Sequence, residues 1–245
     1  MEFTEDVCIF KVGLFKENDL WVRYLSPTKG VLTSFAFGGA VSRKRFSGCL
    51  DALNIVRVHV KSSKEGRYLQ LNEGTLLHRH GDIARDLKRL GMAVNCIQFT
   101  EYVQAGPDNA SAAYSLLVES LAVLEAEEIP PEGFPLFYRA KMAFEQGYMP
   151  ELNTCHVCGQ EIHQKTPSHF KIDQGIVSCC QCGMKGGLTL SVCGQAVDAL
   201  RFLAISRPGD WKGLTLAPAA KSDVFRLIDG FLEYHLGRGR TAGCF

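Results

Sequence analysis

The stretch CHVCGQEIHQKTPSHFKIDQGIVSCCQCG, residues 155–183, contains two Cys-x-x-Cys-Gly units, with 20 residues between Cys158 and Cys179. Two thiolates spaced in this way can bind one metal ion from a tight turn, and the glycine that follows eases the turn. Between the units, HFKI and IVS flank DQG, residues 173–175, which is typical of a β-hairpin. Four thiolates in a tetrahedron suit zinc. The stretch therefore predicts a zinc ribbon over residues 153–185, with one zinc ion bound by Cys155, Cys158, Cys179 and Cys182.

Other interpretations of these cysteines remain open: an iron–sulfur site, redox-active thiols, or a metal site that has been lost. Cys180 would permit a shifted pairing, although its spacing to Cys182 is too short for a metal-binding turn. Four thiolates close the coordination sphere, whereas a hydrolytic zinc needs an open position for water, so we expect a structural metal. The further histidines and cysteines are weaker ligand candidates or packing residues: His156, His163, His169, Cys8, Cys49, Cys96, Cys193 and Cys244.

The first eighty residues have the alternation of β-strands. In NIVRVHVK, residues 54–61, three valines point one way and Arg57, His59 and Lys61 point the other, which predicts a strand that is buried on one face. Similar runs occupy residues 7–12, 20–25, 31–37 and 67–74. Five strands in so short a segment predict a small closed barrel. The long interval 38–53, with room for a short helix, favours a five-stranded OB-fold, and an SH3-like barrel is the structural alternative.

After residue 80 the apolar residues recur every three or four positions, which predicts helices. We expect Asp82 to cap the first helix, Gly147 to end the third, Ser191 to open the helix after the cysteines, and Gly237 to end the last one. The tail GRGRTAGCF is expected to be disordered. The fold class is therefore α+β with two domains: an OB-fold over residues 1–80, and an all-α domain over 81–245 with the zinc ribbon inserted.

Composition limits the class of protein. The chain has 245 residues, 46% of them hydrophobic and 22% charged, which suits a globular protein. No apolar run reaches the roughly 20 residues that cross a bilayer, and the acidic start MEFTED does not match a signal peptide. We therefore expect a cytoplasmic protein, whose ten cysteines favour metal binding over disulfides. P-loop, G-x-S-x-G and H-E-x-x-H motifs are absent from the sequence, so we expect no enzymatic activity.

Basic residues gather in the amino-terminal segment. Residues 1–80 hold 12 Lys and Arg against 8 Asp and Glu, a net charge of +4. The run SRKR, residues 42–45, could bind phosphates beside an aromatic side chain on which bases stack. A solvated surface without a ligand is the alternative. The candidate nucleic-acid-binding residues are Arg23, Lys29, Phe35, Arg43, Lys44, Arg45, Arg57, Lys61 and Lys64.

Two segments carry a resemblance to a known family. FKENDLWVRYLSPTKGVLTSFAFGGAVSRKRFSGCL, residues 15–50, and AFEQGYMPELNTCHVCG, residues 143–159, resemble motifs of the bacterial RecO family. The resemblance implies a recombination mediator in DNA repair that binds single- and double-stranded DNA and anneals complementary strands. It also implies that the protein engages RecR, docks on the carboxyl-terminal tail of single-stranded-DNA-binding protein, and helps to load RecA, in the cytoplasm with the nucleoid. Some members lack the cysteines, which implies that the metal is not the function.

An acidic tail with an apolar end would need a hydrophobic slot with a basic rim. Arg139, Lys141 and Arg201, on the helices beside the ribbon, are candidates for that rim, and ordinary surface charge is the alternative. Two other functions stay open. One is a sequence-tolerant RNA-binding or ribosome-associated protein with an OB-fold and a zinc ribbon, and the other is an enzyme with an unrecognised site.

Overall fold

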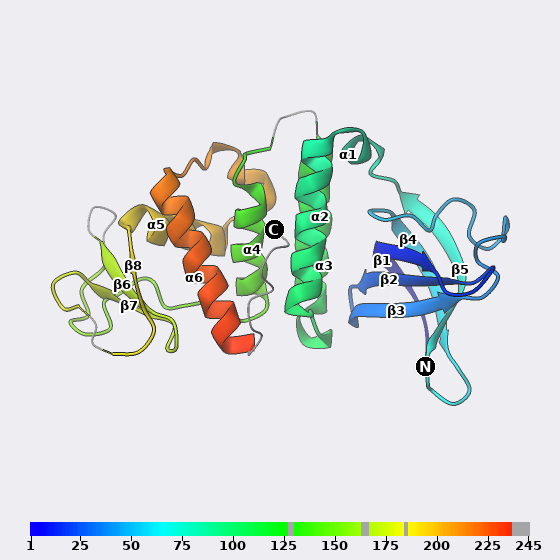
Figure 1. Ribbon diagram of the computed structural model, residues 1–245, viewed down its shortest axis with the longest axis horizontal. Coiled ribbons are helices and arrows are strands. Elements are labelled where there is room, and N and C mark those ends of the chain that lie inside the picture. The colour runs from blue at the N-terminus through cyan, green and yellow to red at the C-terminus, as the bar shows by residue number, and fades with distance from the viewer. Residues whose placement is uncertain (127–129, 163–166, 184–185, 237–245) are drawn as a thin grey trace. The chain divides into compact units, whose positions relative to one another are not determined.

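A computed structural model describes residues 1–126, 130–162, 167–183 and 186–236 (Figure 1). The chain divides into two compact units, Met1–Glu127 and Glu128–Phe245, and each is described by itself. The predictions for His163, Cys244, the helix end at Gly237 and the tail lie outside the described residues. The domain boundary predicted after residue 80 stays a prediction.

Five strands form the sheet of the first unit, as predicted. They pair in the order β1-β2-β3-β5-β4, and β1 also pairs with β4, so the sheet closes on itself. The closing contact is narrow: β3 and β5 run parallel and pair only at Ser34–Leu69 and Phe35–Gln70. The strands are β1 (Glu2–Leu14), β2 (Leu20–Ser26), β3 (Gly30–Ala36), β4 (Ile55–Ser62) and β5 (Leu69–His78).

Alternating side chains fill the centre of this sheet. Val56, Val58 and Val60 of β4 are fully buried, as their spacing predicts, and they pack with residues of β1, β2 and β5. Phe46 and Cys49 reach the same core from the segment between β3 and β4. The helix that this segment had room for is absent, because residues 37–53 run through successive turns. The segment thus contributes two buried side chains to the core of the sheet, although it contains no helix.

Three helices complete the first unit: α1 (Gly81–Arg85), α2 (Leu87–Val103) and α3 (Ala110–Glu125), with a short 3-10 turn at Pro107–Asn109. The predicted cap was wrong: Asp82 lies in the first turn of α1, and it is Asp86 that accepts hydrogen bonds from the backbone of Lys88 and Arg89 at the start of α2. The loop between α2 and α3 touches the β2–β3 turn, where the amide of Val31 donates to the carbonyl of Ala105.

The second unit contains α4 (Phe134–Glu145), α5 (Gly194–Ile205) and α6 (Pro218–Leu236), with a 3-10 segment at Pro208–Gly213. Trp211 is fully buried and contacts the rings of Phe134 and Phe137, and its indole donates to the hydroxyl of Ser206. Within the described residues, every helix is too short or too polar to cross a membrane.

The inserted ribbon contains a three-stranded sheet. The predicted hairpin is confirmed as β6 (Ser168–Lys171) and β7 (Ile176–Cys179). A third strand, β8 (Thr189–Val192), pairs with the other edge of β6. Ser191 therefore lies in a strand and does not open the next helix, which begins at Gly194 after the N-cap Cys193. The sheet thus passes directly into α5, which ties the ribbon to the helices of its unit.

Candidate metal centre and nucleic-acid interface

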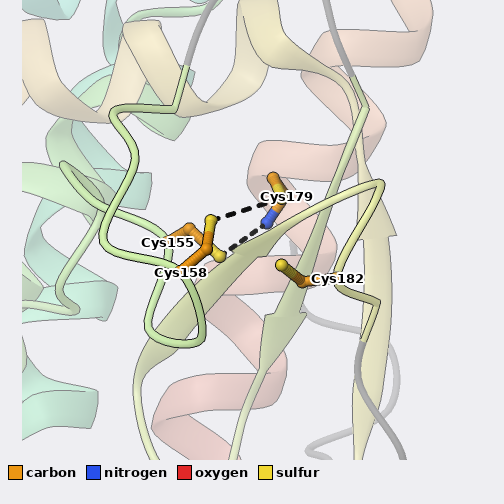
Figure 2. A group of neighbouring side chains, drawn as sticks. All are labelled: Cys155, Cys158, Cys179 and Cys182. Carbon is orange, nitrogen blue, oxygen red and sulfur yellow. Dashed lines mark hydrogen bonds between the residues drawn. The ribbon is translucent and has the colours of Figure 1, made fainter.

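The four predicted cysteine ligands come together in the ribbon. The Sγ atoms of Cys155, Cys158, Cys179 and Cys182 all lie within 4.8 Å of one another (Figure 2). All four thiols are free, and the Sγ atoms of Cys158 and Cys179 are 4.0 Å apart. Sulfurs bound to a shared zinc ion at about 2.3 Å lie about 3.8 Å apart in a tetrahedron, so this separation fits zinc.

Each half of the cluster is a tight turn closed by its glycine. The amide of Gly159 donates to the carbonyl of Cys155 at 2.8 Å, and the amide of Gly183 donates to that of Cys179 at 3.1 Å. Both glycines have positive φ, +72° and +60°, which a residue with a side chain rarely adopts. The predicted role of these glycines is therefore confirmed, since each allows the chain to turn immediately after its second cysteine.

The surroundings of Cys155 suit a thiolate. Cys155 is buried, and burial raises the pKa of a thiol, but backbone amides of Cys179, Cys158 and Val157 oppose this and bring its pKa down to about 6. One of these donors is resolved as a hydrogen bond, from the amide of Cys179 to the Sγ of Cys155 at 3.3 Å. Because zinc binds the deprotonated form, these donors favour the ligand state.

The alternative ligands stay outside the cluster. Cys180 is exposed, and the group of mutually close ligand atoms contains Cys179 and Cys182 instead. Among the described residues, His156 and His169 belong to no such group. The register predicted from the sequence is thus the one in which the four sulfurs converge.

Aromatic side chains gather on the surface of the barrel. Phe35 contacts Phe15 at a ring-centroid distance of 4.8 Å and Tyr68 at 6.0 Å, and Tyr68 contacts Phe37 at 5.8 Å. Phe15 and Tyr68 expose 49% and 41% of their surface. We call these four residues the aromatic cluster. The sequence prediction included only Phe35; the other three sit just beyond strand ends, where no alternation marks them.

Cations border the aromatic cluster. The guanidinium of Arg45 donates to the carbonyl of Phe37, and the ammonium of Lys16 lies 5.6 Å from the ring centroid of Phe15. Arg43 and Lys44 are exposed in the same turn segment as Arg45, and Lys64 is exposed in the turn before Tyr68. In the described parts of the chain, Arg43, Lys44 and Lys64 form no ion pair, so their charges are available to a ligand.

The other predicted cations are already paired. Arg57 and Lys61 on β4 face Asp6 and Glu2 on β1, at 2.7 Å and 3.0 Å. These carboxylates lie in register with the cations across the two strands. The sequence prediction missed them because strand pairing, not spacing along one strand, brings them together. Arg23 pairs with Glu101 of α2, and Lys29 lies 3.9 Å from Glu5 and over the ring of Phe3.

The three candidates for a basic rim lie in the second unit, each with partners. Arg139 is buried, with its guanidinium over the ring of Phe225. Lys141 donates to the carbonyl of Ala204 at 2.7 Å and pairs with Glu145. Arg201 donates to the carbonyls of Leu152, Asn153 and Ile162, which flank the first cysteine pair. The contacts of Arg201 thus fix the base of the loop that carries Cys155.

Comparison with known proteins identifies the family. Residues 1–79 match the model of the recombination protein O amino-terminal region, and residues 84–242 match that of its carboxyl-terminal region. The chain is 39% identical to the DNA repair protein RecO of Nitratidesulfovibrio vulgaris, with 100% of this chain and 99% of the relative covered. It is 41% identical to that of Oleidesulfovibrio alaskensis, covering 97% and 96%, and 26% identical to that of an Anaeromyxobacter species, covering 94% and 90%. Both family models and these full-length matches agree with the resemblance seen in the sequence, and the chain therefore belongs to the RecO family.

Proposed function

We propose that this protein is a recombination mediator in DNA repair that binds DNA through its amino-terminal barrel. The proposal is supported by the family and by relatives that carry the name DNA repair protein RecO. The observation that carries it is the aromatic cluster, two of whose rings are strongly exposed, with unpaired cations in the adjoining turns. We assign the barrel to the OB-fold class, whose members bind nucleic acids on this kind of surface.

The chemistry of this surface suits a sequence-tolerant ligand. Every base has a π-face, and stacking on an aromatic side chain contributes about 1–3 kcal/mol per base. Arg43, Lys44 and Lys64 would neutralise phosphates, which carry no sequence information. A surface of this kind binds exposed bases more tightly than a closed duplex, and it can hold a single strand until its complement arrives. Strand annealing is therefore part of the proposal.

We assign the four cysteines a structural zinc ion, one per chain, that stabilises the ribbon. Its four thiolates leave no position for substrate, so its contribution is free energy of folding. No covalent step is needed for binding and annealing, and the proposed function is accordingly not enzymatic. The aromatic cluster and its cations belong to the first unit and the cysteines to the second. Metal binding and DNA binding should therefore be separable by mutation.

Partner binding completes the proposal. We propose that the protein engages RecR and the acidic tail of single-stranded-DNA-binding protein, and thereby helps to load RecA in the cytoplasm. Arg139, Lys141 and Arg201 remain the proposed basic rim for that tail. Lys141 and Arg201 now bind carbonyls of their own unit, so tail binding would require an exchange of these partners.

The test is strand annealing on complementary oligonucleotides coated with single-stranded-DNA-binding protein. We expect the wild-type protein to accelerate duplex formation, and a Phe15→Ala/Tyr68→Ala variant to lose most of the acceleration. Leu77→Ala, which removes a side chain of similar exposure on β5, is the matched control and should retain it. Acceleration by the double variant equal to wild type would refute the stacking surface. Equal competition by RNA of the same sequence would favour a general RNA-binding function instead.

A further inference from the structure

A second cluster of side chains that can bind a metal belongs to the first unit, whereas the cysteines belong to the second. His78 ends β5, His80 follows two residues later, and Glu125 is the last residue of α3. One carboxylate oxygen, Oε2 of Glu125, lies 2.7 Å from Nε2 of His78 and 2.8 Å from Nδ1 of His80. The two imidazole rings meet edge to face with centroids 4.4 Å apart. The three ligand atoms all lie within 4.8 Å of one another, and a bound ion would replace the two hydrogen bonds that now join them.

We propose that His78, His80 and Glu125 form a second divalent metal site, which binds Zn²⁺ in addition to the zinc of the four cysteines. Two imidazole nitrogens and one carboxylate are a set that zinc accepts, and three protein ligands leave its fourth position to water. His78 ends β5 and His80 follows it by two positions, and the edge-to-face contact of their rings places them side by side. The fold then brings Glu125 of α3, 45 residues from His80, into contact with both rings.

Burial differs among the three ligands in a way that gives the ion a path. The side chain of His80 is 3% exposed, that of Glu125 is 21% exposed, and that of His78 is 53% exposed. The site is therefore lined by His80 on the inside and open to solvent at His78. An ion would enter past His78, which is the most exposed of the three side chains.

The burial of the His80 ring also determines which of the two metal sites binds zinc first. When Nδ1 of His80 binds a metal, its proton must sit on Nε2, and Nε2 is buried without a hydrogen-bond partner among the described residues. A buried donor without an acceptor weakens the complex. The four-thiolate site carries no such penalty. We therefore expect zinc to fill the cysteines first and this site second.

The place of the site in the fold gives it a role. His78 and His80 lie where the chain leaves the barrel, and Glu125 lies at the end of the last helix of the same unit. A bound ion would link the end of β5 to the end of α3. The expected consequence is a first unit that unfolds at a higher temperature when zinc exceeds one equivalent.

The test measures zinc on the full-length, untagged protein. Metal-free protein is titrated with Zn²⁺, freed of loose ion by gel filtration, and analysed for bound zinc. We expect two zinc ions per wild-type chain and one in His78→Ala and in Glu125→Gln. His59→Ala is the control, because His59 also bonds a carboxylate, Glu2 at 2.8 Å, but has no second histidine beside it; it should retain two.

A Cys155→Ser/Cys158→Ser variant separates the two sites and should retain one zinc ion, lost on adding His78→Ala. His78 is exposed, so its substitution should leave the fold intact, as circular dichroism can verify. One zinc ion per wild-type chain, unchanged in His78→Ala, would overturn the proposal. Two ions in both His78→Ala and Glu125→Gln would also overturn it, since the second ion would then lie elsewhere.

Discussion

The guanidinium of Arg57 on β4 meets the carboxylate of Asp6 on β1 through two hydrogen bonds, Nε to Oδ1 at 2.7 Å and Nη2 to Oδ2 at 3.0 Å. Further along β4, His59 and Lys61 both contact one oxygen of Glu2, at 2.8 Å and 3.0 Å. The outer face of β4 therefore carries its charges as cross-strand pairs, whereas Arg43 and Lys44 carry theirs unpaired. To bind the cations of β4, a phosphate must displace a carboxylate, whereas to bind Arg43 or Lys44 it must displace only water.

The two groups of cations should differ in their contribution to DNA binding. We expect Arg43→Ala/Lys44→Ala to lower the slope of log K against log salt for single-stranded DNA by about 1.4, since each phosphate contact contributes about 0.7. Arg57→Ala/Lys61→Ala removes the same charge and should lower the slope by clearly less. Fluorescence anisotropy with a labelled oligonucleotide over a salt series measures both. If the second variant loses the larger slope, β4 is the phosphate-binding face.

The Arg57–Asp6 pair predicts a pH dependence of stability. Hydrogen bonding from Arg57 holds the pKa of Asp6 below its usual value of 3.8. A lowered carboxyl pKa contributes stability at neutral pH, and this contribution is lost as the pH falls through that lowered value. Both side chains are well exposed, so water screens the pair and the coupling should be small.

A double-mutant cycle with Asp6→Asn and Arg57→Gln, followed by urea unfolding, measures this coupling. We expect it at pH 7 and expect it to shrink toward zero in the most acidic buffer that the fold tolerates. A coupling that grows on acidification would show that the sign of the pKa shift is wrong.

The register of the metal site can be tested with two adjacent cysteines. Cys179→Ser removes a ligand and should release the zinc and lower the unfolding temperature, because ion binding contributes directly to folding. Cys180→Ser changes the same atom one residue away and should retain one zinc ion in the cysteine site. Metal analysis and thermal unfolding give both results. Loss of zinc in Cys180→Ser alone would place the ligand at residue 180.

Neither cysteine substitution should abolish DNA binding, because the aromatic cluster belongs to the other unit. We expect the affinity of Cys179→Ser for single-stranded DNA to stay within about threefold of wild type, a change below 1 kcal/mol. A larger loss would mean that the ribbon itself contacts DNA.

Gly30 should be the most sensitive position of the β2–β3 turn. Its φ is +75°, and a Cβ atom there would lie 1.9 Å from the carbonyl oxygen of Ala105. Gly30→Ala should therefore destabilise the first unit by more than about 2 kcal/mol, since both the backbone strain and the contact oppose it. Gly66→Ala, at φ +70° with open space around it, isolates the strain and should cost less. Equal losses in the two variants would show that the contact with Ala105 is unimportant.

Arg201 should support the ribbon independently of the metal. Arg201→Gln would leave the carbonyls of Leu152, Asn153 and Ile162 without their charged donor, and we expect a loss of about 1–3 kcal/mol. Arg226→Gln, which removes an exposed arginine near Asp223 on α6, is the control and should cost less than 1 kcal/mol. Urea unfolding with and without a chelator measures both. No loss in Arg201→Gln under either condition would contradict this role.

Much of the fold follows from short-range patterns. The period of two in NIVRVHVK identified β4 and its buried valines, and the two Cys-x-x-Cys-Gly units identified the converging thiols. These succeed because the residues that decide the structure are neighbours in the chain. β8 was missed because four residues, TLSV, are too few for a period, and β8 is a strand only by pairing with β6.

The features that sequence reasoning missed depend on pairing between distant segments. Asp6 neutralises Arg57 because β1 and β4 are in register, and Glu101 does the same for Arg23 across 78 residues. The aromatic cluster likewise joins Phe15, Phe35 and Tyr68 from three parts of the chain. The prediction of the helix cap failed for a local reason. Asp82 and Asp86 both precede apolar residues, and because α1 ends at Arg85, it is Asp86 that caps the long helix α2.

The position of Arg201 bears on how such a ribbon can change over evolution. The guanidinium of Arg201, on α5, holds the base of the loop that carries Cys155, and the four sulfurs hold the loop at its cysteines. A descendant that lost one cysteine would release the zinc at once but would keep the contacts of Arg201. The cofactor could then be lost without leaving the loop free of both supports.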